Sequence, residues 1–233
     1  MESNVKPINQ INEKDTFLFP LDENFSSKKD RSLLKDFIHF LHTHDVRRPL
    51  KFSYIDSDAT LLEGLTLREN IYLDSIPTSF SESKEFQLSN FLKRSGNGHL
   101  IDLFQNITLL DEFPSQVDLQ TKKLAALTKG LLRPSKFLLL ECPEKYLNKK
   151  NLEIFTNALQ YQVVTTGQIV LIATDYTQYW ESMANKMVNR NDQNQFRIET
   201  IRHKGKIIKE SDAQSNDGHL IFVNFNDTKK ESA

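Results

Sequence analysis

Short apolar runs alternate with amphipathic segments along most of the chain. Four runs have strand character, and they span residues 16–19, 50–55, 136–140 and 168–173. Runs that are apolar on both faces suit a parallel sheet that is covered by helices. Apolar positions at helical spacing predict further segments as helices, at residues 32–42, 67–73, 89–94, 119–132, 149–160 and 177–188. This alternation of strands and helices predicts an α/β fold.

The clearest predicted helix lies at residues 119–132, where leucines recur at helical spacing. Asp118 precedes it as a plausible N-cap, and Pro134 follows its end. After Gln195 the pattern changes to two alternating stretches, FRIETIRHKGKIIKE and HLIFVNF, which turn-prone residues separate. That end of the chain predicts a small antiparallel addition to the sheet.

Composition narrows the class of protein. The chain has 233 residues, of which 38% are hydrophobic and 26% charged, an ordinary balance for a globular protein of one domain. The 30 basic and 31 acidic residues give a net charge of −1, so no overall field supports nucleic-acid binding. The single cysteine, the lack of a signal-peptide pattern and the lack of an apolar run of about 18 residues predict a cytoplasmic protein that does not insert into a membrane.

Glycine is scarce in this chain. It has 7 glycines, whereas average usage of roughly 7% would give about sixteen. Loops that bind phosphate wrap it with the backbone N–H groups of glycines. The composition therefore disfavours a function that needs a glycine-rich phosphate loop.

Four segments resemble motifs of a known family. LTLRENIYL at 65–73, which follows FSYIDSDATLLEG, is similar to the stretch after the Q-loop in ABC-type ATPase domains. FPSQVDLQTKKLAALTKGLLRPSKFLLLECP at 113–143 resembles, without a gap, the signature motif of that family, its following helix and its Walker B strand. NFSSKKDRSLLKDFI resembles the Walker A loop with its helix, and IVLIATDY resembles the strand that ends in the switch histidine. The resemblance covers roughly residues 16–209.

The resemblance implies a P-loop NTPase-like fold of the ABC ATPase type. In that fold a parallel sheet core carries a helical subdomain, and we expect a reduced N-terminal antiparallel β-subdomain and a C-terminal β-hairpin. The reduction is expected because the spacers before residue 16 and between Ser32 and Ser57 are short for that subdomain. We expect a single domain over 1–233, with the helical subdomain inserted at 65–118 and a frayed tail at 226–233.

The chain departs from the family at nearly every position that does chemistry. In the Walker A loop, the glycine positions carry Asn24, Ser27 and Lys29, while Asp30 replaces the lysine and Arg31 the hydroxyl residue that binds Mg²⁺. The other altered positions are Ser57 for the Q-loop glutamine, Asp118, Leu119 and Gln120 for the signature serine and glycines, Glu141 and Cys142 for the Walker B aspartate and catalytic glutamate, Asn148 for the D-loop aspartate, and Asp175 for the switch histidine.

The loss of catalytic groups beside a retained apolar framework is typical of a pseudo-ATPase. We therefore expect no enzymatic activity, no nucleotide binding, no cofactor and no metal. The resemblance implies a scaffold or regulatory subunit of an ABC transporter-like membrane complex, held at the inner face of the cytoplasmic membrane by a permease-like protein. A homodimer or a second ABC ATPase-like subunit is a further possible partner. The residues expected to bind the permease-like partner are Ser57, Leu62, Leu65, Arg68, Glu69, Tyr72 and Ile76.

Alternative interpretations concern residual chemistry. An unconventional ATPase or nucleotide sensor would use Lys28 or Lys29 together with Glu141. The histidines His39, His42 and His44 beside Asp45 could hold a metal, but histidines are also favourable at a helix C-terminus, which is the interpretation we prefer. For Cys142, the preferred interpretation is a buried apolar residue at a strand end.

Overall fold

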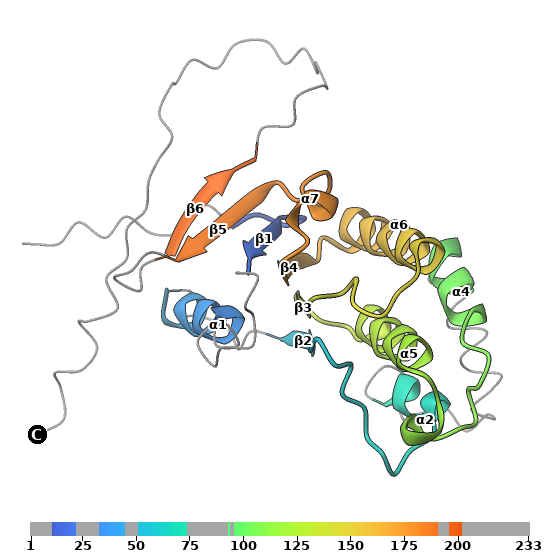
Figure 1. Cartoon of the computed structure of the whole chain (residues 1–233). Coiled ribbons are helices and arrows are strands. Elements are labelled where there is room, and N and C mark those ends of the chain that lie inside the picture. Colours follow the sequence, from blue (N-terminus) through green and yellow to red (C-terminus); the bar gives the residue numbers. More distant parts are fainter. Residues whose placement is uncertain are drawn as a thin grey trace, which may run out of the picture.

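The computed structural model describes residues 11–21, 33–44, 51–73, 93, 96–190 and 196–201. These residues form one 6-stranded sheet in the order β2-β3-β4-β1-β5-β6, shown in Figure 1. The strands are β1 (Thr16–Pro20), β2 (Phe52–Ile55), β3 (Phe137–Glu141), β4 (Ile169–Thr174), β5 (Lys186–Arg190) and β6 (Phe196–Thr200). Strands β1 to β5 run parallel to their neighbours, and β6 pairs antiparallel with β5. The predicted α/β fold with a mostly parallel sheet is confirmed.

The helices cover both faces of the sheet. They are α1 (Leu33–His44), α2 (Leu67–Tyr72), α4 (Gly98–Gln105), α5 (Leu119–Leu132), α6 (Lys149–Thr166) and α7 (Thr177–Trp180), with a short 3-10 helix at Pro114–Gln116. Helix α5 has the predicted bounds, because Asp118 caps its first turn by accepting a hydrogen bond from the Thr121 backbone N–H at 2.7 Å. Helix α4 was not predicted, and most of the helix predicted at 89–94 lies outside the described residues.

The helix predicted over 177–188 is wrong beyond Trp180. Helix α7 ends there, and the chain then enters β5, which pairs with β1 on one side and β6 on the other. Tertiary contacts decide the outcome: Lys186 forms a buried ion pair of 2.7 Å with Asp15, and Asn185 accepts a hydrogen bond from the Thr16 backbone N–H at 2.9 Å. The antiparallel addition therefore begins at β5 and not after Gln195, and its predicted continuation beyond residue 201 lies outside the described residues.

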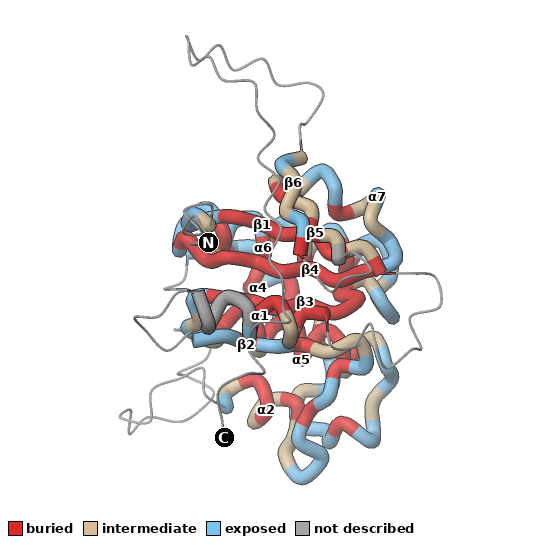
Figure 2. Tube along the Cα trace, turned by 90° about the vertical axis from the view of Figure 1, so that its left-hand side faces the viewer, coloured by how far each residue is buried: buried red, intermediate tan, exposed pale blue. Residues whose placement is uncertain are grey.

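Alternate residues of the strands build two separate apolar layers. Leu18, Leu138 and Ile172 pack toward α4, α5 and α6, whereas Phe17 and Leu139 pack toward α1 on the opposite face. Figure 2 shows the central strands β1, β3 and β4 buried almost throughout. The period-2 alternation thus places both apolar faces of the sheet out of water.

An aromatic cluster attaches α1 to the sheet. The fully buried ring of Phe37 lies 5.8 Å from Phe17, 5.0 Å from Phe19 and 5.2 Å from Phe196, measured between ring centroids. Tilted and edge-to-face pairs of this kind add to the stabilisation from burial. One helix residue therefore joins the central strand β1 to the peripheral strand β6.

Replacing this ring should destabilise the fold markedly. Phe37→Ala is expected to lower the free energy of unfolding by about 3 to 5 kcal/mol, because it leaves a cavity between α1 and the sheet. Phe52→Ala is the matched control, since the Phe52 side chain is 44% exposed, and it should cost about 1 kcal/mol or less. Urea denaturation of both variants measures the difference, and equal losses would contradict the described packing.

Candidate functional site

Several of the altered motif positions gather at the carboxyl ends of the parallel strands. Strand β2 leads into Ser57, β3 ends in Glu141 and Cys142, and β4 leads into Asp175. Ligands of open α/β sheets bind outside these strand ends. The Walker A positions lie outside the described residues; they are Asn24, Ser27, Lys29, Asp30 and Arg31, together with Lys28.

The N-terminus of α5 is occupied by the chain itself. The Asp118 carboxylate accepts from the Thr121 backbone N–H, and Leu119 exposes 53% of its surface at the start of the helix. Gln120 accepts a hydrogen bond of 3.0 Å from the backbone N–H of Asn148, which in turn caps α6 through the Asn151 N–H at 2.9 Å. At each helix start, a side chain of this chain thus binds one of the free backbone N–H groups.

A buried lysine connects three segments near the strand ends. Lys123 of α5 is fully buried, and its ammonium donates to the backbone carbonyls of Asp56 at 3.1 Å, Ser57 at 3.2 Å and Glu141 at 3.4 Å. Burial lowers the pKa of Lys123 to about 8, although Cys142 nearby acts in the opposite direction. The sequence analysis did not single out Lys123. The feature that could have identified it is a charged residue within the apolar face of the helix predicted at 119–132.

Cys142 lies beside two acidic side chains. Its thiol, the carboxylate of Glu144 and the carboxylate of Asp175 have ligand atoms within 4.8 Å of one another. Burial, followed by the charges of Glu144 and Asp175, raises the pKa of Cys142 to about 12. A thiol with that pKa stays protonated at neutral pH, so it is a poor general base. The predicted burial of Cys142 is confirmed, but the sequence analysis missed Glu144.

The Glu144 carboxylate is held by two buried donors. The Thr174 hydroxyl donates to one oxygen at 2.6 Å, and the Trp180 indole N–H donates to the other at 2.9 Å. Cys142 itself has a φ of 40°, a left-handed conformation that residues other than glycine rarely adopt. Its backbone N–H continues the ladder to the Ala173 carbonyl at 2.8 Å. The backbone of Cys142 and the carboxylate of Glu144 are therefore each held by hydrogen bonds to β4 or to the segment that follows it.

The predicted partner surface surrounds a short, well-capped helix. Thr66 and Glu69 form a reciprocal capping box at the start of α2, and Arg68 forms an ion pair of 2.8 Å with Asp111. Leu62 exposes 51% of its surface. The other described members of the predicted partner surface are partly buried: Ser57, Leu65, Arg68, Glu69 and Tyr72. Ile76 lies outside the described residues.

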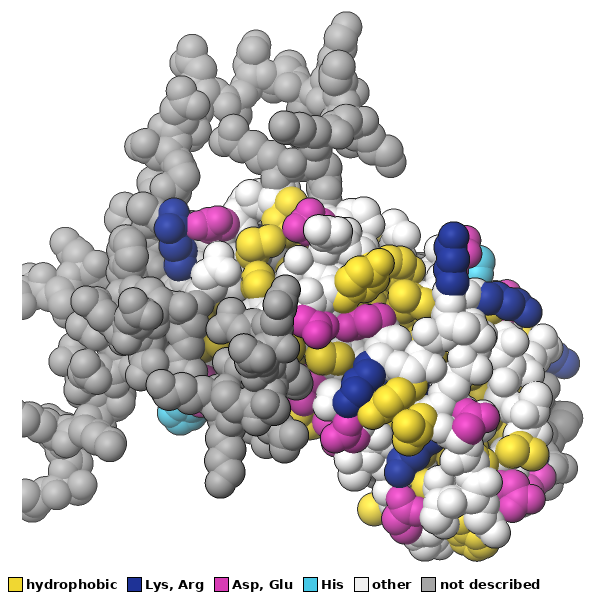
Figure 3. Space-filling model, in the orientation of Figure 1, with side chains coloured by type: hydrophobic (Ala, Val, Ile, Leu, Met, Phe, Trp, Pro, Cys, Tyr) yellow, Lys and Arg dark blue, Asp and Glu magenta, His cyan; other side chains and the backbone are white. Residues whose placement is uncertain are grey.

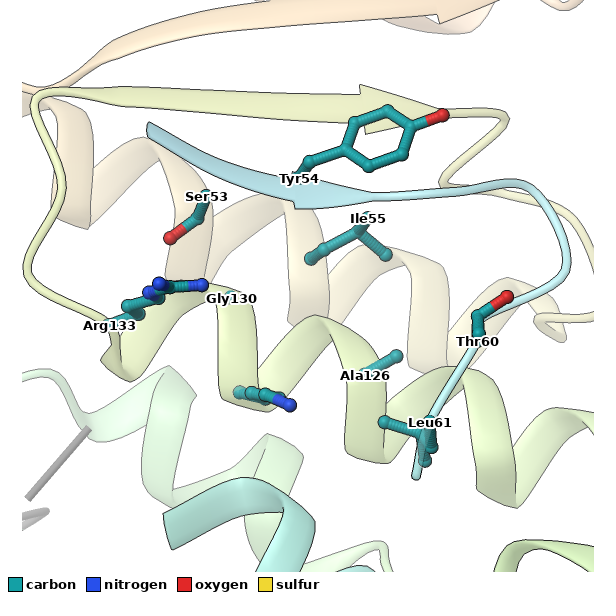
Figure 4. Close-up of a pocket in the computed structure, with 9 residues that line it drawn as sticks. Ser53, Tyr54, Ile55, Thr60, Leu61, Ala126, Gly130 and Arg133 are labelled. Atoms are coloured by element: carbon teal, nitrogen blue, oxygen red, sulfur yellow. The ribbon is translucent and has the colours of Figure 1, made fainter. Parts of the chain in front are cut away.

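A small pocket lies between β2 and α5, and none of the altered motif positions lines it. Its volume is about 100 Å³, well below the roughly 300 Å³ of small ligand sites. Figure 4 shows Ser53 pointing from β2 toward Arg133, with Tyr54 on the other side of the strand. The Ser53 hydroxyl is buried and has no hydrogen-bond partner among the described residues. The pocket is too small for a nucleotide.

Of the predicted histidine cluster, His39 alone has a described side chain. His39 is exposed on α1, the side chains of His42 and His44 are outside the described set, and Asp45 is also outside it. The group Cys142, Glu144 and Asp175 is the one that meets the spacing for a metal among the described residues. No helix in the described part of the chain is long and apolar enough to cross a membrane.

The lowered pKa of Lys123 predicts a dependence of stability on pH. Between about pH 8 and its ordinary pKa of 10.5, the unfolded chain holds a proton that the folded chain has released, so the free energy of unfolding rises with pH in this window. From about pH 7.5 to 10, this gain should be about 2 to 3 kcal/mol larger for the unaltered chain than for Lys123→Met.

Urea denaturation at the two pH values tests this expectation. Lys122→Met is the matched control, because Lys122 is partly exposed and pairs with Glu63 at 3.2 Å. The free energy of unfolding of that control should change with pH as it does in the unaltered chain. If Lys123→Met showed the same pH dependence as Lys122→Met, the lysine would not be buried in its charged form.

Comparison with known proteins identifies the fold. No protein-family model and no curated protein match the sequence. The ATP-binding subunit of an ABC transporter shares 16% identity over 76% of this chain and 75% of that chain, with a TM-score of 0.56. A dimeric bacterial ABC transporter cassette shares 16% identity over 83% of this chain and 88% of that chain, with a TM-score of 0.61.

The same fold also occurs outside transporters. An archaeal ribosome recycling factor, solved in complex with a ribosomal stalk protein, shares 14% identity over 81% of this chain and 34% of that chain, with a TM-score of 0.54. Identities this low are evidence for the fold alone. The chain thus has the P-loop NTPase-like α/β fold of ABC ATP-binding cassettes.

Proposed function

We propose that this chain is a catalytically inactive ABC ATPase-like protein that serves as a scaffold or regulatory subunit of a membrane complex. One observation carries the proposal: the Asp118 carboxylate occupies the N-terminus of α5. The exposed N–H groups and partial positive charge of a helix start normally attract phosphate. Here a carboxylate satisfies part of that donor set and repels an approaching phosphate. The exposed Leu119 side chain also stands where a glycine would allow close approach.

The groups at the strand ends support the same proposal. Cys142 takes the position of the glutamate that polarises water, and its raised pKa leaves it a neutral thiol. The sequence of the first loop lacks the glycines of a Walker A motif. Each missing catalytic group costs on the order of 10² to 10⁴ in rate. The combined loss would reduce ATP turnover below detection.

The helical part of the chain offers a surface for a protein partner. Five large apolar side chains on and around it are exposed: Leu62, Leu73, Leu109, Phe113 and Leu119. Figure 3 shows hydrophobic side chains between charged ones over the part of the molecule where α2 and α5 lie in Figure 1. In the proposed complex, this surface receives a short cytoplasmic helix of a permease-like protein and holds the chain at the inner face of the membrane.

The proposed oligomeric arrangement follows from composite sites. ABC-type ATPases combine the Walker A loop of one protomer with the signature of the other. The sequence of this chain departs from both motifs, so pairing with an active subunit would spoil both sites. We therefore favour docking of this chain as a monomer, or as a homodimer that binds no ATP, over a heterodimer with an active subunit.

Capture from membranes tests the scaffold role. The tagged full chain, expressed in its source cells, should retain a polytopic membrane protein after detergent extraction, because the surface around Leu62 binds it. Leu62→Arg should reduce that recovery by about tenfold or more, as expected for a central apolar contact. Val164→Arg on α6 is the matched control, since Val164 is 56% exposed but lies outside the partner surface. A chain found wholly in the cytosolic fraction would contradict the proposal, as would equal recovery with Leu62→Arg.

Phosphate release separates the proposal from a residual ATPase. The full chain with Mg·ATP should release phosphate at the rate of a protein-free blank, and Glu141→Ala should not change that rate. Asp118→Ala is the matched variant, because it frees the α5 N-terminus without touching Glu141. Sustained release that Glu141→Ala abolishes and Asp118→Ala preserves would favour the unconventional ATPase instead.

A further inference from the structure

The pocket between β2 and α5 contains a buried hydroxyl group without a partner. Ser53 is 2% exposed, and its Oγ has no hydrogen-bond partner among the described residues. Ser53 and Ile55 lie on the buried face of β2, where Ile55 joins the apolar core and Ser53 adds a polar group. A buried hydroxyl without a hydrogen bond destabilises a fold, because it loses its contacts with water and gains none in return. The Ser53 hydroxyl is therefore placed to bind a molecule that occupies the pocket.

Two basic side chains line the same pocket, and no acidic side chain is among its described lining residues. Arg133 and Lys129 come from the end of α5, and both are half-buried. The other residues around Ser53 in this lining are Tyr54, Ile55, Thr60, Leu61, Ala126 and Gly130. Figure 4 shows the Ser53 hydroxyl pointing toward Arg133. The pocket thus combines one neutral donor with two cationic donors, a set that suits an anion.

The position of the two cations at a helix C-terminus has an ordinary explanation, but that explanation does not account for Ser53. Basic side chains are favourable near the partial negative charge of a helix C-terminus. That charge is about half an elementary charge, so the two full charges of Arg133 and Lys129 outweigh it. A guanidinium has five N–H donors and an ammonium has three. Each side chain can therefore bind an anion in addition to its contacts within the chain.

The volume of the pocket fits a small anion. It is about 100 Å³, whereas a cavity needs roughly 10 to 15 Å³ to hold one water molecule. Several atoms of the size of a water oxygen therefore fit, as a tetrahedral anion with four oxygens requires. Helix α5 comes close to β2 beside this space, since a side chain at Gly130 would collide with Ile55. The same volume is too small to enclose a large organic group.

We propose that Ser53, Arg133 and Lys129 form a binding site for a free tetrahedral oxyanion of the size of inorganic phosphate. The Ser53 hydroxyl donates a hydrogen bond to one oxygen of the anion. The guanidinium of Arg133 is suited to bidentate contacts with two further oxygens, and Lys129 adds a second positive charge. The bound anion connects β2 to the end of α5. None of the altered motif positions takes part, so the site goes beyond the proposed scaffold function.

Isothermal titration of the full chain with inorganic phosphate tests the site directly. A saturable one-to-one isotherm with a dissociation constant below about 1 mM is expected at low ionic strength, where attraction between charges is least screened. Glycerol 3-phosphate should bind at least about tenfold more weakly, because the pocket holds one small anion only. Absence of saturable phosphate binding would overturn the proposal. Equal affinity for glycerol 3-phosphate would contradict the assignment to a free anion.

Variants of the pocket show where the anion binds. Ser53→Ala and Arg133→Met should each weaken phosphate binding about tenfold or more, because hydrogen bonds to charged groups are strong. Arg197→Met is the matched control, since it removes the same charge from β6, at the opposite edge of the sheet from β2. Its affinity should equal that of the unaltered chain. Unchanged affinity in Ser53→Ala or Arg133→Met, or an equal loss in Arg197→Met, would overturn the proposal.

Thermal unfolding gives a second readout for the serine variant. Ser53→Ala should fold, because the hydroxyl that it removes has no partner among the described residues. Phosphate should raise the Tm of the unaltered chain more than that of Ser53→Ala, since a ligand stabilises the folded state that binds it. Equal increases would contradict the proposal. Both measurements use neither ATP nor a membrane partner, so their failure would leave the scaffold role untouched.

Discussion

The arrangement of the chain at the carboxyl ends of β2 and β3 depends on the buried ammonium group of Lys123. A charge inside the fold needs hydrogen-bond acceptors, and Lys123 obtains them from the backbone after β2 and at the end of β3. The carbonyls of Asp56, Ser57 and Glu141 must therefore point toward α5. A change in any of these segments would leave the charge without part of its acceptor set. Lys123 thus connects α5 to the carboxyl ends of β2 and β3.

Side chains of this chain bind backbone N–H groups at the starts of α5 and α6. Asp118 accepts a hydrogen bond from the Thr121 N–H in the first turn of α5, and Gln120 accepts one from the backbone N–H of Asn148 at the start of α6. Together with Lys123, these contacts connect α5 to both neighbouring segments through hydrogen bonds within the chain. The arrangement favours a helical part that is fixed to the sheet. A fixed surface is suitable for a scaffold, which needs a constant shape more than a catalytic cycle.

The sequence pattern predicted the parts of the fold that local chemistry determines. Strands β1, β3 and β4 are buried on both faces and appear as apolar runs, and Asp118 with Pro134 marks the ends of α5. The failure at 177–188 has a specific cause. Trp180, Ala184 and Val188 are spaced by four residues and are all buried, as in a helix, yet they belong to a helix, a turn and a strand. Their burial comes from separate tertiary contacts, which periodicity cannot distinguish.

The candidate site depends on contacts between distant segments, so less of it could be predicted. Altered motif positions such as Cys142 and Asp175 follow from spacing alone, whereas Glu144 and Lys123 gain meaning only when β3, β4 and α5 meet. We propose that this chain, which has the fold of nucleotide-binding cassettes, does not bind nucleotide. Isothermal titration of the full chain with Mg·ATP tests it most directly. No saturable heat is predicted up to about 1 mM ATP, and a saturable one-to-one isotherm in that range would contradict the claim.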